Sequence, residues 1–215
     1  MNHVNQKQIY QACLGLLSAL LSTQSLAAEL KVQVFDSEKA PIENAVVYAE
    51  PESKVGLPIA SAIIEQRGRQ FNPLVSIVQT GTDVTFPNFD SVRHHVYSFS
   101  PAKTFELKLY SGVPASPVKF DKPGTVVLGC NIHDFMVAFI QVVDTPYFAK
   151  TDKTGKAVLA NVPNGKYTLK VWHYALAKEK KVFEKSLVLN GAASETVALT
   201  LKPFVISPEN NLSGY

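Results

Sequence analysis

The sequence predicts an all-β protein in the form of a β-sandwich or Greek-key barrel. Short runs rich in Val, Ile, Tyr and Phe recur along the chain, and Gly, Pro, Asn and Asp separate them. Beyond the N-terminal segment, apolar residues do not recur at the spacing of an amphipathic helix. Such runs, bounded by turn residues, are typical of sandwiches and barrels. With 215 residues, of which 46% are hydrophobic, the chain is long enough for two small domains with buried cores.

A first group of expected strands ends near residue 143. Gly81 offers a tight reversal, and Pro123 followed by Gly124 is the pair favoured in a type II turn. The expected strands cover residues 30–35, 45–49, 74–79, 83–86, 95–99, 105–110, 124–128 and 136–143. We expect residues 29–144 to form one domain.

A second group of strands follows a junction at Asp144, Thr145 and Pro146, and Gly155 and Gly165 mark turns within it. Its expected strands cover residues 148–151, 157–161, 167–172, 182–189 and 196–201. We expect residues 145–202 to form a small second β-sandwich, and residues 203–215, which are rich in Pro, Asn and Gly, to be a flexible tail.

Residues 1–28 have the pattern of a secretory signal peptide. Lys7 precedes the apolar run 13–21, and small residues follow at Ser25, Ala27 and Ala28. The run is shorter than a membrane span, and no later segment contains about 18 continuous apolar residues. The sequence therefore predicts an exported, periplasmic protein without a transmembrane segment.

Cleavage of that peptide would leave Cys130 as the only cysteine. Exported proteins meet an oxidising compartment in which thiols usually pair, so a single unpaired thiol needs an explanation. An inert buried thiol is one such explanation. The neighbours of Cys130 indicate a different one.

A short loop between two expected strands contains three side chains that can bind a metal ion. Cys130, His133 and Met136 bring a thiolate, an imidazole and a thioether within seven residues, and His94 begins another expected strand. Two imidazoles and a thiolate with a weak axial thioether are the ligands of a blue-copper electron-transfer site. We therefore expect one type 1 copper ion at His94, Cys130, His133 and Met136.

Several alternatives remain open at this point. A strand register shifted by one residue would make His95 the ligand in place of His94, because successive side chains face opposite sides of a strand. Structural zinc fits less well, since methionine is a poor zinc ligand and no further cysteine would remain after cleavage of the expected signal peptide, which carries Cys13. For a cysteine hydrolase, no residue that would orient the histidine is evident. The fourth mature histidine, His173, is expected at the end of a strand in the second domain.

The spacing Cys130-x-x-His133-x-x-Met136, with a histidine and Val96 upstream, resembles the cupredoxins, the plastocyanin-like blue-copper proteins, and amicyanins in particular. The resemblance covers residues from about 70 to 143. It implies a cupredoxin-like Greek-key sandwich and a one-electron carrier that is not an enzyme. It also implies a transient redox partner, such as a c-type cytochrome or an amine-oxidising quinoprotein. This chain has Ile132 and Asp134 where the family often has proline.

A second resemblance concerns residues 151–169, where Asp152, Gly155 and Gly165 mark hairpins like those of transthyretin-like, or carboxypeptidase regulatory, sandwiches. It implies a structural or interaction module. Two functions therefore compete with electron transfer: copper binding or delivery without redox chemistry, and ligand recognition by the second sandwich. The net charge of +3 gives no support to nucleic-acid binding.

Overall fold

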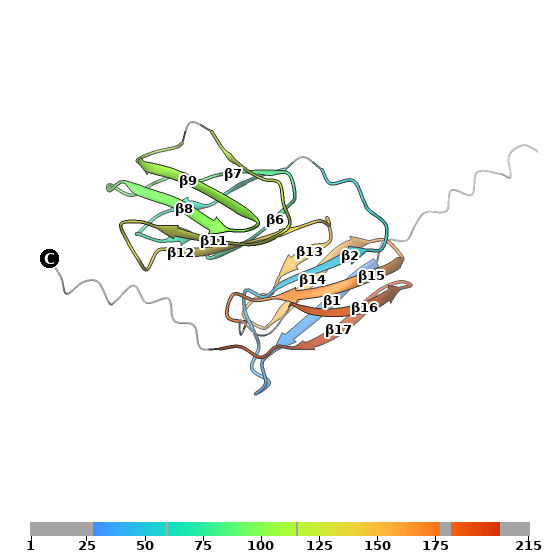
Figure 1. Cartoon of the computed structure of the whole chain (residues 1–215). Coiled ribbons are helices and arrows are strands. Elements are labelled where there is room, and N and C mark those ends of the chain that lie inside the picture. Colours follow the sequence, from blue (N-terminus) through green and yellow to red (C-terminus); the bar gives the residue numbers. More distant parts are fainter. Residues whose placement is uncertain (1–27, 59, 115, 177–181, 203–215) are drawn as a thin grey trace, which may run out of the picture.

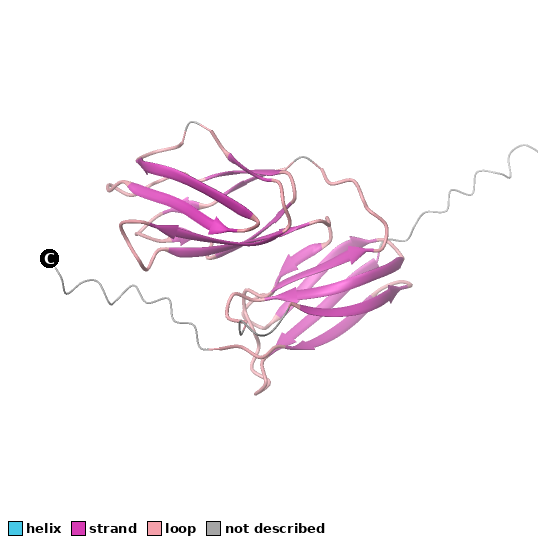
Figure 2. Cartoon of the chain, viewed as in Figure 1, coloured by secondary structure: helices cyan, strands magenta, loops and turns pink. Residues whose placement is uncertain are grey.

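The computed structural model describes residues 28–58, 60–114, 116–176 and 182–202, and every regular element in them is a β-strand (Figures 1 and 2). The prediction of an all-β fold is confirmed. Nearly all of the predicted signal peptide and the whole predicted tail at 203–215 lie outside the described residues. Within the described ranges, the chain contains no helix with the length and apolar character needed to cross a membrane.

The first sandwich, built from strands β3 to β12, packs a five-stranded sheet against a three-stranded one (Figure 1). The larger sheet has the strand order β6-β12-β11-β8-β9 and contains β6 (Val75–Gln79), β8 (His94–Ser100), β9 (Lys103–Tyr110), β11 (Gly124–Cys130) and β12 (Val137–Val143). The smaller sheet, of order β10-β7-β3, contains β3 (Ser61–Ile63), β7 (Thr82–Thr85) and β10 (Val118–Phe120). A short hairpin of β4 (Glu65–Gln66) and β5 (Phe71–Asn72) completes this unit.

Alternation along these strands explains the core between the two sheets. In β11, Val126, Leu128 and Cys130 are buried, and the residues between them are more exposed. Period-two burial of this kind places every second side chain between the sheets. The core therefore extends to the end of β11, and Cys130 is its last residue in this strand.

The second sandwich contains both ends of the described chain. One sheet has the order β14-β1-β17, and the other has the order β13-β2-β15-β16. Its strands are β1 (Ala28–Phe35), β2 (Val46–Pro51), β13 (Phe148–Lys150), β14 (Lys156–Val162), β15 (Gly165–Trp172), β16 (Phe183–Leu189) and β17 (Ala193–Ala198). A separate buried cluster, with Leu30, Val47 and Leu169 among its members, fills this sandwich.

The position of β1 and β2 corrects the expectation that residues 29–144 form one domain. β1 pairs with β14 and β17, and β2 pairs with β13 and β15, so the strands nearest the N-terminus belong with residues 148–198. The physical reason is that an alternating strand such as β1 can cover either core equally well. Its partner is chosen by long-range pairing, which local pattern does not encode.

A third apolar cluster joins the two sandwiches. Phe139 of β12 stacks on Tyr174 with ring centroids 5.0 Å apart and lies 6.2 Å from Trp172. Lys150 Nζ also donates a hydrogen bond to the carbonyl oxygen of Val75, at 3.1 Å. The two sandwiches are therefore packed against each other by buried contacts.

Candidate metal centre

Two neighbouring strands bring the first two candidate ligands to the same end of the larger sheet. β8 and β11 are antiparallel, and Cys130, the last residue of β11, pairs with Val96 of β8. His94 is the first residue of β8, two positions before Val96. Antiparallel pairing therefore sets His94 beside Cys130 although they are 36 residues apart in sequence.

The third candidate ligand comes from the loop that follows β11. His133 lies in the loop between β11 and β12, and its carbonyl oxygen accepts a hydrogen bond of 2.9 Å from the backbone N–H of Met136. This bond closes a turn of the loop between His133 and Met136. Because both ends of the loop are strand residues, the direction of the His133 side chain is constrained by the sheet.

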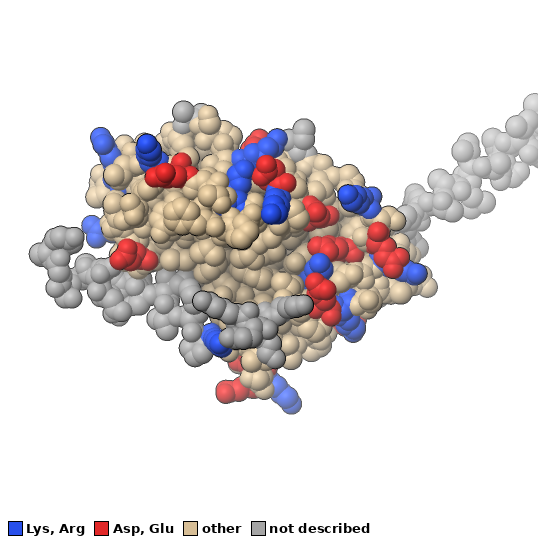
Figure 3. Space-filling model, viewed as in Figure 1, with Lys and Arg blue, Asp and Glu red and all other residues tan. Residues whose placement is uncertain are grey.

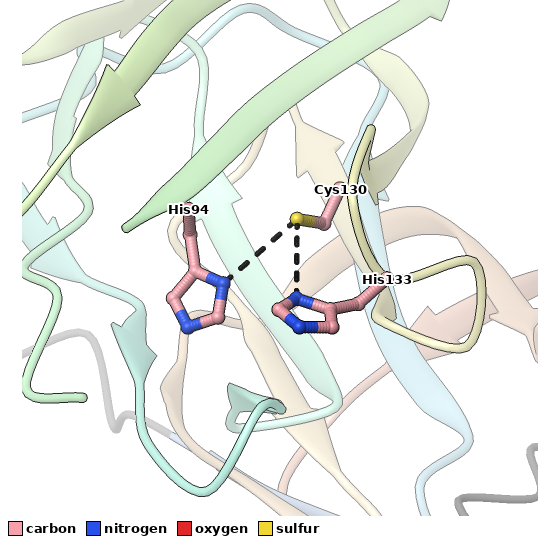
Figure 4. A group of neighbouring side chains, drawn as sticks. All are labelled: His94, Cys130 and His133. Atoms are coloured by element: carbon pink, nitrogen blue, oxygen red, sulfur yellow. Dashed lines mark hydrogen bonds between the residues drawn. The ribbon is translucent and has the colours of Figure 1, made fainter. Parts of the chain in front are cut away.

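The three side chains converge on one point, as Figure 4 shows. Cys130 Sγ lies 3.9 Å from His94 Nδ1 and 3.9 Å from His133 Nδ1. The two imidazole rings have their centroids 5.1 Å apart and are inclined at 61°. All three donor atoms lie within 4.8 Å of one another.

His94, not His95, points toward Cys130. His94 is fully buried, whereas the ring of His95 lies on the other face of β8, with Nε2 2.9 Å from Glu106 Oε1 of β9. The alternation along β8 therefore places His94 among the candidate ligands and His95 outside them.

Met136 lies in the same buried cluster as Cys130, just before β12 begins at Val137. The expected strand at 136–143 thus starts one residue later, and Met136 is a loop residue. Its side chain is almost completely buried. The structure therefore places all four predicted site residues at one end of the first sandwich.

The spacing of the donor atoms suits a single metal ion. Bonds of about 2.0 Å to nitrogen and about 2.3 Å to sulfur, spread by about 120°, would place the two donors roughly 3.7 Å apart. The two nitrogen–sulfur separations of 3.9 Å are close to this value. Two imidazole nitrogens, a thiol and a neighbouring thioether are also the donor types that copper accepts.

The surroundings of His133 favour its neutral form. Burial lowers the pKa of His133 below its usual value, and the positive charge of Arg69, with that of His94 whenever its ring is protonated, acts in the same direction, whereas Asp90 acts against it. A neutral imidazole keeps the lone pair that a metal ion needs. Asp134, the next residue in the loop, is exposed to solvent.

Asp90 is a site residue that the sequence pattern does not reveal. Its Oδ2 lies 2.8 Å from His94 Nε2, on the side of the ring away from Cys130. Burial acts to raise the pKa of Asp90, but hydrogen bonds from the N–H groups of Arg69 and Gly68 and from His94 outweigh it, and the pKa is lowered. No local pattern marks this aspartate, because a spacing of four residues predicts contact only on a helix.

Comparisons with known proteins give partial matches. No protein-family model matches the chain, and no curated protein matches its sequence. A copper-containing nitrite reductase from Thermus scotoductus SA-01 is 26% identical over 40% of this chain and 22% of that chain, with a TM-score of 0.35. The matched part of this chain thus spans about a fifth of the nitrite reductase.

Two smaller proteins are matched over almost their whole length. A purple cupredoxin from Nitrosopumilus maritimus is 23% identical over 38% of this chain and 99% of that chain, with a TM-score of 0.35. A reduced amicyanin variant is 17% identical over 47% of this chain and 100% of that chain, with a TM-score of 0.36. Each of the three likenesses covers less than half of the present chain.

Proposed function

We propose that this chain binds one copper ion through His94, Cys130, His133 and Met136 and carries single electrons between redox partners in the periplasm. The observation that carries the proposal is the convergence of His94 Nδ1, Cys130 Sγ and His133 Nδ1 within 4.8 Å at one end of a β-sandwich. The buried thioether of Met136 in the same loop supplies the fourth donor type.

The protein residues have separate tasks in this proposal. The bound copper would supply a centre that alternates between Cu(I) and Cu(II). His94 and Cys130 lie on paired strands, so their separation is held by the sheet, and Met136 is buried in the same apolar cluster as Cys130. A site held in one geometry by strands needs little rearrangement when its charge changes.

His133 offers the route to the surface. It is only partly buried, whereas His94 and Cys130 are buried, and the exposed side chain of Ile132 lies beside it in the loop. A partner such as a c-type cytochrome or an amine-oxidising quinoprotein would approach this loop in a small, transient contact. Figure 3 shows acidic and basic side chains interspersed on the visible face, which gives no support to nucleic-acid binding.

One structural feature favours a second function, a cysteine hydrolase. The imidazole of His94 contacts the carboxylate of Asp90 on one side and the thiol of Cys130 on the other, as in a catalytic triad. Asp90 would be the residue that orients the histidine, which the sequence did not reveal. Against this reading, Cys130 is 3% exposed and His94 is fully buried, so an acyl substrate would not reach the thiol. We therefore propose a carrier and not an enzyme.

The decisive experiment is to add Cu(II) to the purified protein and record the visible spectrum. We expect an intense thiolate-to-copper band in the wild type and its loss in Cys130→Ser. We also expect His94→Ala to abolish or strongly weaken the band, and His95→Ala, its matched control on the other face of β8, to retain it. A colourless wild type would refute the proposal and leave ligand recognition by the second sandwich as the better hypothesis.

A second measurement separates electron transfer from copper delivery. We expect the bound copper to be reduced by ascorbate and reoxidised over repeated cycles without loss of the band. We also expect slow transfer of copper to a competing chelator, because three of the four proposed ligands are buried. Rapid release to the chelator, without reversible redox cycling, would instead indicate a delivery protein.

A further inference from the structure

We propose that Asp90 is the positioning residue of the metal centre, acting through His94 to present Nδ1 to the metal and to add a negative charge behind that ligand. The proposal rests on the function proposed above, because it assumes that His94 is a ligand. Asp90 is not itself a proposed ligand. Its Oδ2 lies 2.8 Å from His94 Nε2, the ring nitrogen that does not face Cys130.

The carboxylate of Asp90 is itself held in place from two directions. Oδ1 accepts a hydrogen bond of 2.6 Å from the N–H of Gly68, and Oδ2 accepts one of 2.9 Å from the N–H of Arg69. Gly68 and Arg69 both have positive φ, at 63° and 56°, and successive N–H groups in such a turn form a nest that favours an anion. The turn between β4 and β5 thus fixes Asp90 before any metal binds.

The backbone of Asp90 is anchored through Asn88. The N–H of Asp90 donates to Asn88 Oδ1 at 2.9 Å, and Asn88 Nδ2 donates to the carbonyl oxygens of Val92 and Tyr110 at 2.9 and 3.0 Å. Asn88 is buried. Asp90 is therefore tied to the end of β9 as well as to the β4–β5 turn, and its side chain has little freedom to leave His94.

This arrangement selects one tautomer of His94. An ionised carboxylate only accepts hydrogen bonds, so the proton of a neutral His94 ring resides on Nε2. Nδ1 then carries the lone pair, and Nδ1 is the atom that faces Cys130 Sγ at 3.9 Å. Carboxylates that hold metal-binding histidines in this way also make the ring a stronger donor.

The charge of Asp90 has a second consequence. A negative charge behind a ligand stabilises the more highly charged ion, so Asp90 favours Cu(II) over Cu(I) and lowers the reduction potential. Asp90→Asn separates the two effects: the amide oxygen still accepts from His94 Nε2, but the charge is gone. Asp90→Ala removes both the acceptor and the charge.

The tautomer is tested first in the metal-free protein, by the 15N chemical shifts of the His94 ring. We expect the Nε2–H form alone in the wild type and in Asp90→Asn, and a mixture of tautomers in Asp90→Ala. This readout needs no copper, so it remains informative even if the wild type gives no coloured copper complex. Such an outcome would refute the proposed function but not the orientation of His94 by Asp90.

The second readout is Cu(II) affinity, measured by competition with a chelator, together with the reduction potential. We expect Asp90→Ala to weaken Cu(II) binding by about 10- to 100-fold. Asp90→Asn should raise the reduction potential while it retains most of the affinity for Cu(II). Each tenfold loss of Cu(II) affinity relative to Cu(I) affinity raises the potential by about 59 mV.

Glu106→Gln is the matched control, because Glu106 Oε1 lies 2.9 Å from His95 Nε2 on the opposite face of β8, without the hydrogen-bond geometry of the Asp90–His94 contact. We expect it to leave the tautomer of His94, the affinity and the potential unchanged. The proposal is overturned if Asp90→Ala keeps the wild-type tautomer and binds Cu(II) within about twofold of the wild type, or if Glu106→Gln shifts the potential as far as Asp90→Asn does.

Discussion

The histidines of this protein differ in their neighbours. His94 and His133 face Cys130, whereas His173 is buried in the second sandwich, where its Nδ1 accepts a hydrogen bond of 3.1 Å from the N–H of Ala175. Burial lowers the pKa of His173 from 6.5 to about 4. The folded protein therefore holds this ring neutral at a pH where the unfolded chain already binds a proton.

The pKa of His173 predicts a loss of stability in acid. Its contribution is fully present above pH 6.5, the unfolded value, and is lost as the pH falls toward about 4. The size of the shift corresponds to about 3 kcal/mol of unfolding free energy. We expect His173→Asn, which cannot titrate, to show a shallower decline of stability between pH 6.5 and 4. Urea titrations of the metal-free proteins at several pH values measure this, and parallel declines would contradict it.

The turn between β13 and β14 makes a close contact with β1 in the second sandwich. Gly155 lies in the turn between β13 and β14, with φ at 75°, and its carbonyl oxygen accepts a hydrogen bond of 2.8 Å from the N–H of Val34. A Cβ atom at this position would overlap the carbonyl oxygen of Val34 in β1. The turn therefore needs glycine both for its backbone conformation and for close approach to β1.

We expect Gly155→Ala to destabilise the protein more than Gly191→Ala does. Gly191 also has positive φ, at 95°, but no atom lies within 4 Å of where its Cβ would stand. Both substitutions carry the backbone penalty of about 1 kcal/mol, and Gly155→Ala adds overlap with β1 that costs about 1–3 kcal/mol more. Denaturant unfolding of the two variants tests this, and equal losses would show that β1 yields to the added methyl group.

The contact between the sandwiches links the candidate metal centre to the second unit. Phe139 of β12 packs against Trp172 and Tyr174, and β12 pairs with β11, which carries Cys130. Trp172 is the only tryptophan, so its fluorescence reports on this junction. The visible band expected from the proposed copper site would report on the candidate metal centre at one end of the first sandwich.

We expect the two signals to change together on unfolding, because a shared apolar junction couples the two cores. Phe139→Ala should lower the free energy of unfolding by about 3–5 kcal/mol. Phe99→Ala is the control: Phe99 is 80% exposed, and its loss should change stability by no more than about 0.5 kcal/mol. Fluorescence and visible absorption recorded across one denaturant series measure this, and widely separated transitions in the wild type would contradict coupling.

Most of the strands could be predicted from the sequence because their apolar residues alternate and turn residues bound them. The expected strands at 74–79, 95–99 and 124–128 correspond to β6, β8 and β11. The short strands β3, β4, β5 and β10 were missed. Segments of two or three residues are too short to show a period, and pairing with neighbours defines them.

The compact part of the site is predictable from the sequence alone. Cys130, His133 and Met136 are close because the loop that carries them is short, whatever the rest of the chain does. Three features follow from the folded arrangement instead: His94 and not His95 faces Cys130, Asp90 lies behind His94, and β1 belongs to the second sandwich. These depend on strand register and on contacts between distant segments, where a shift of one residue exchanges the two faces of a strand.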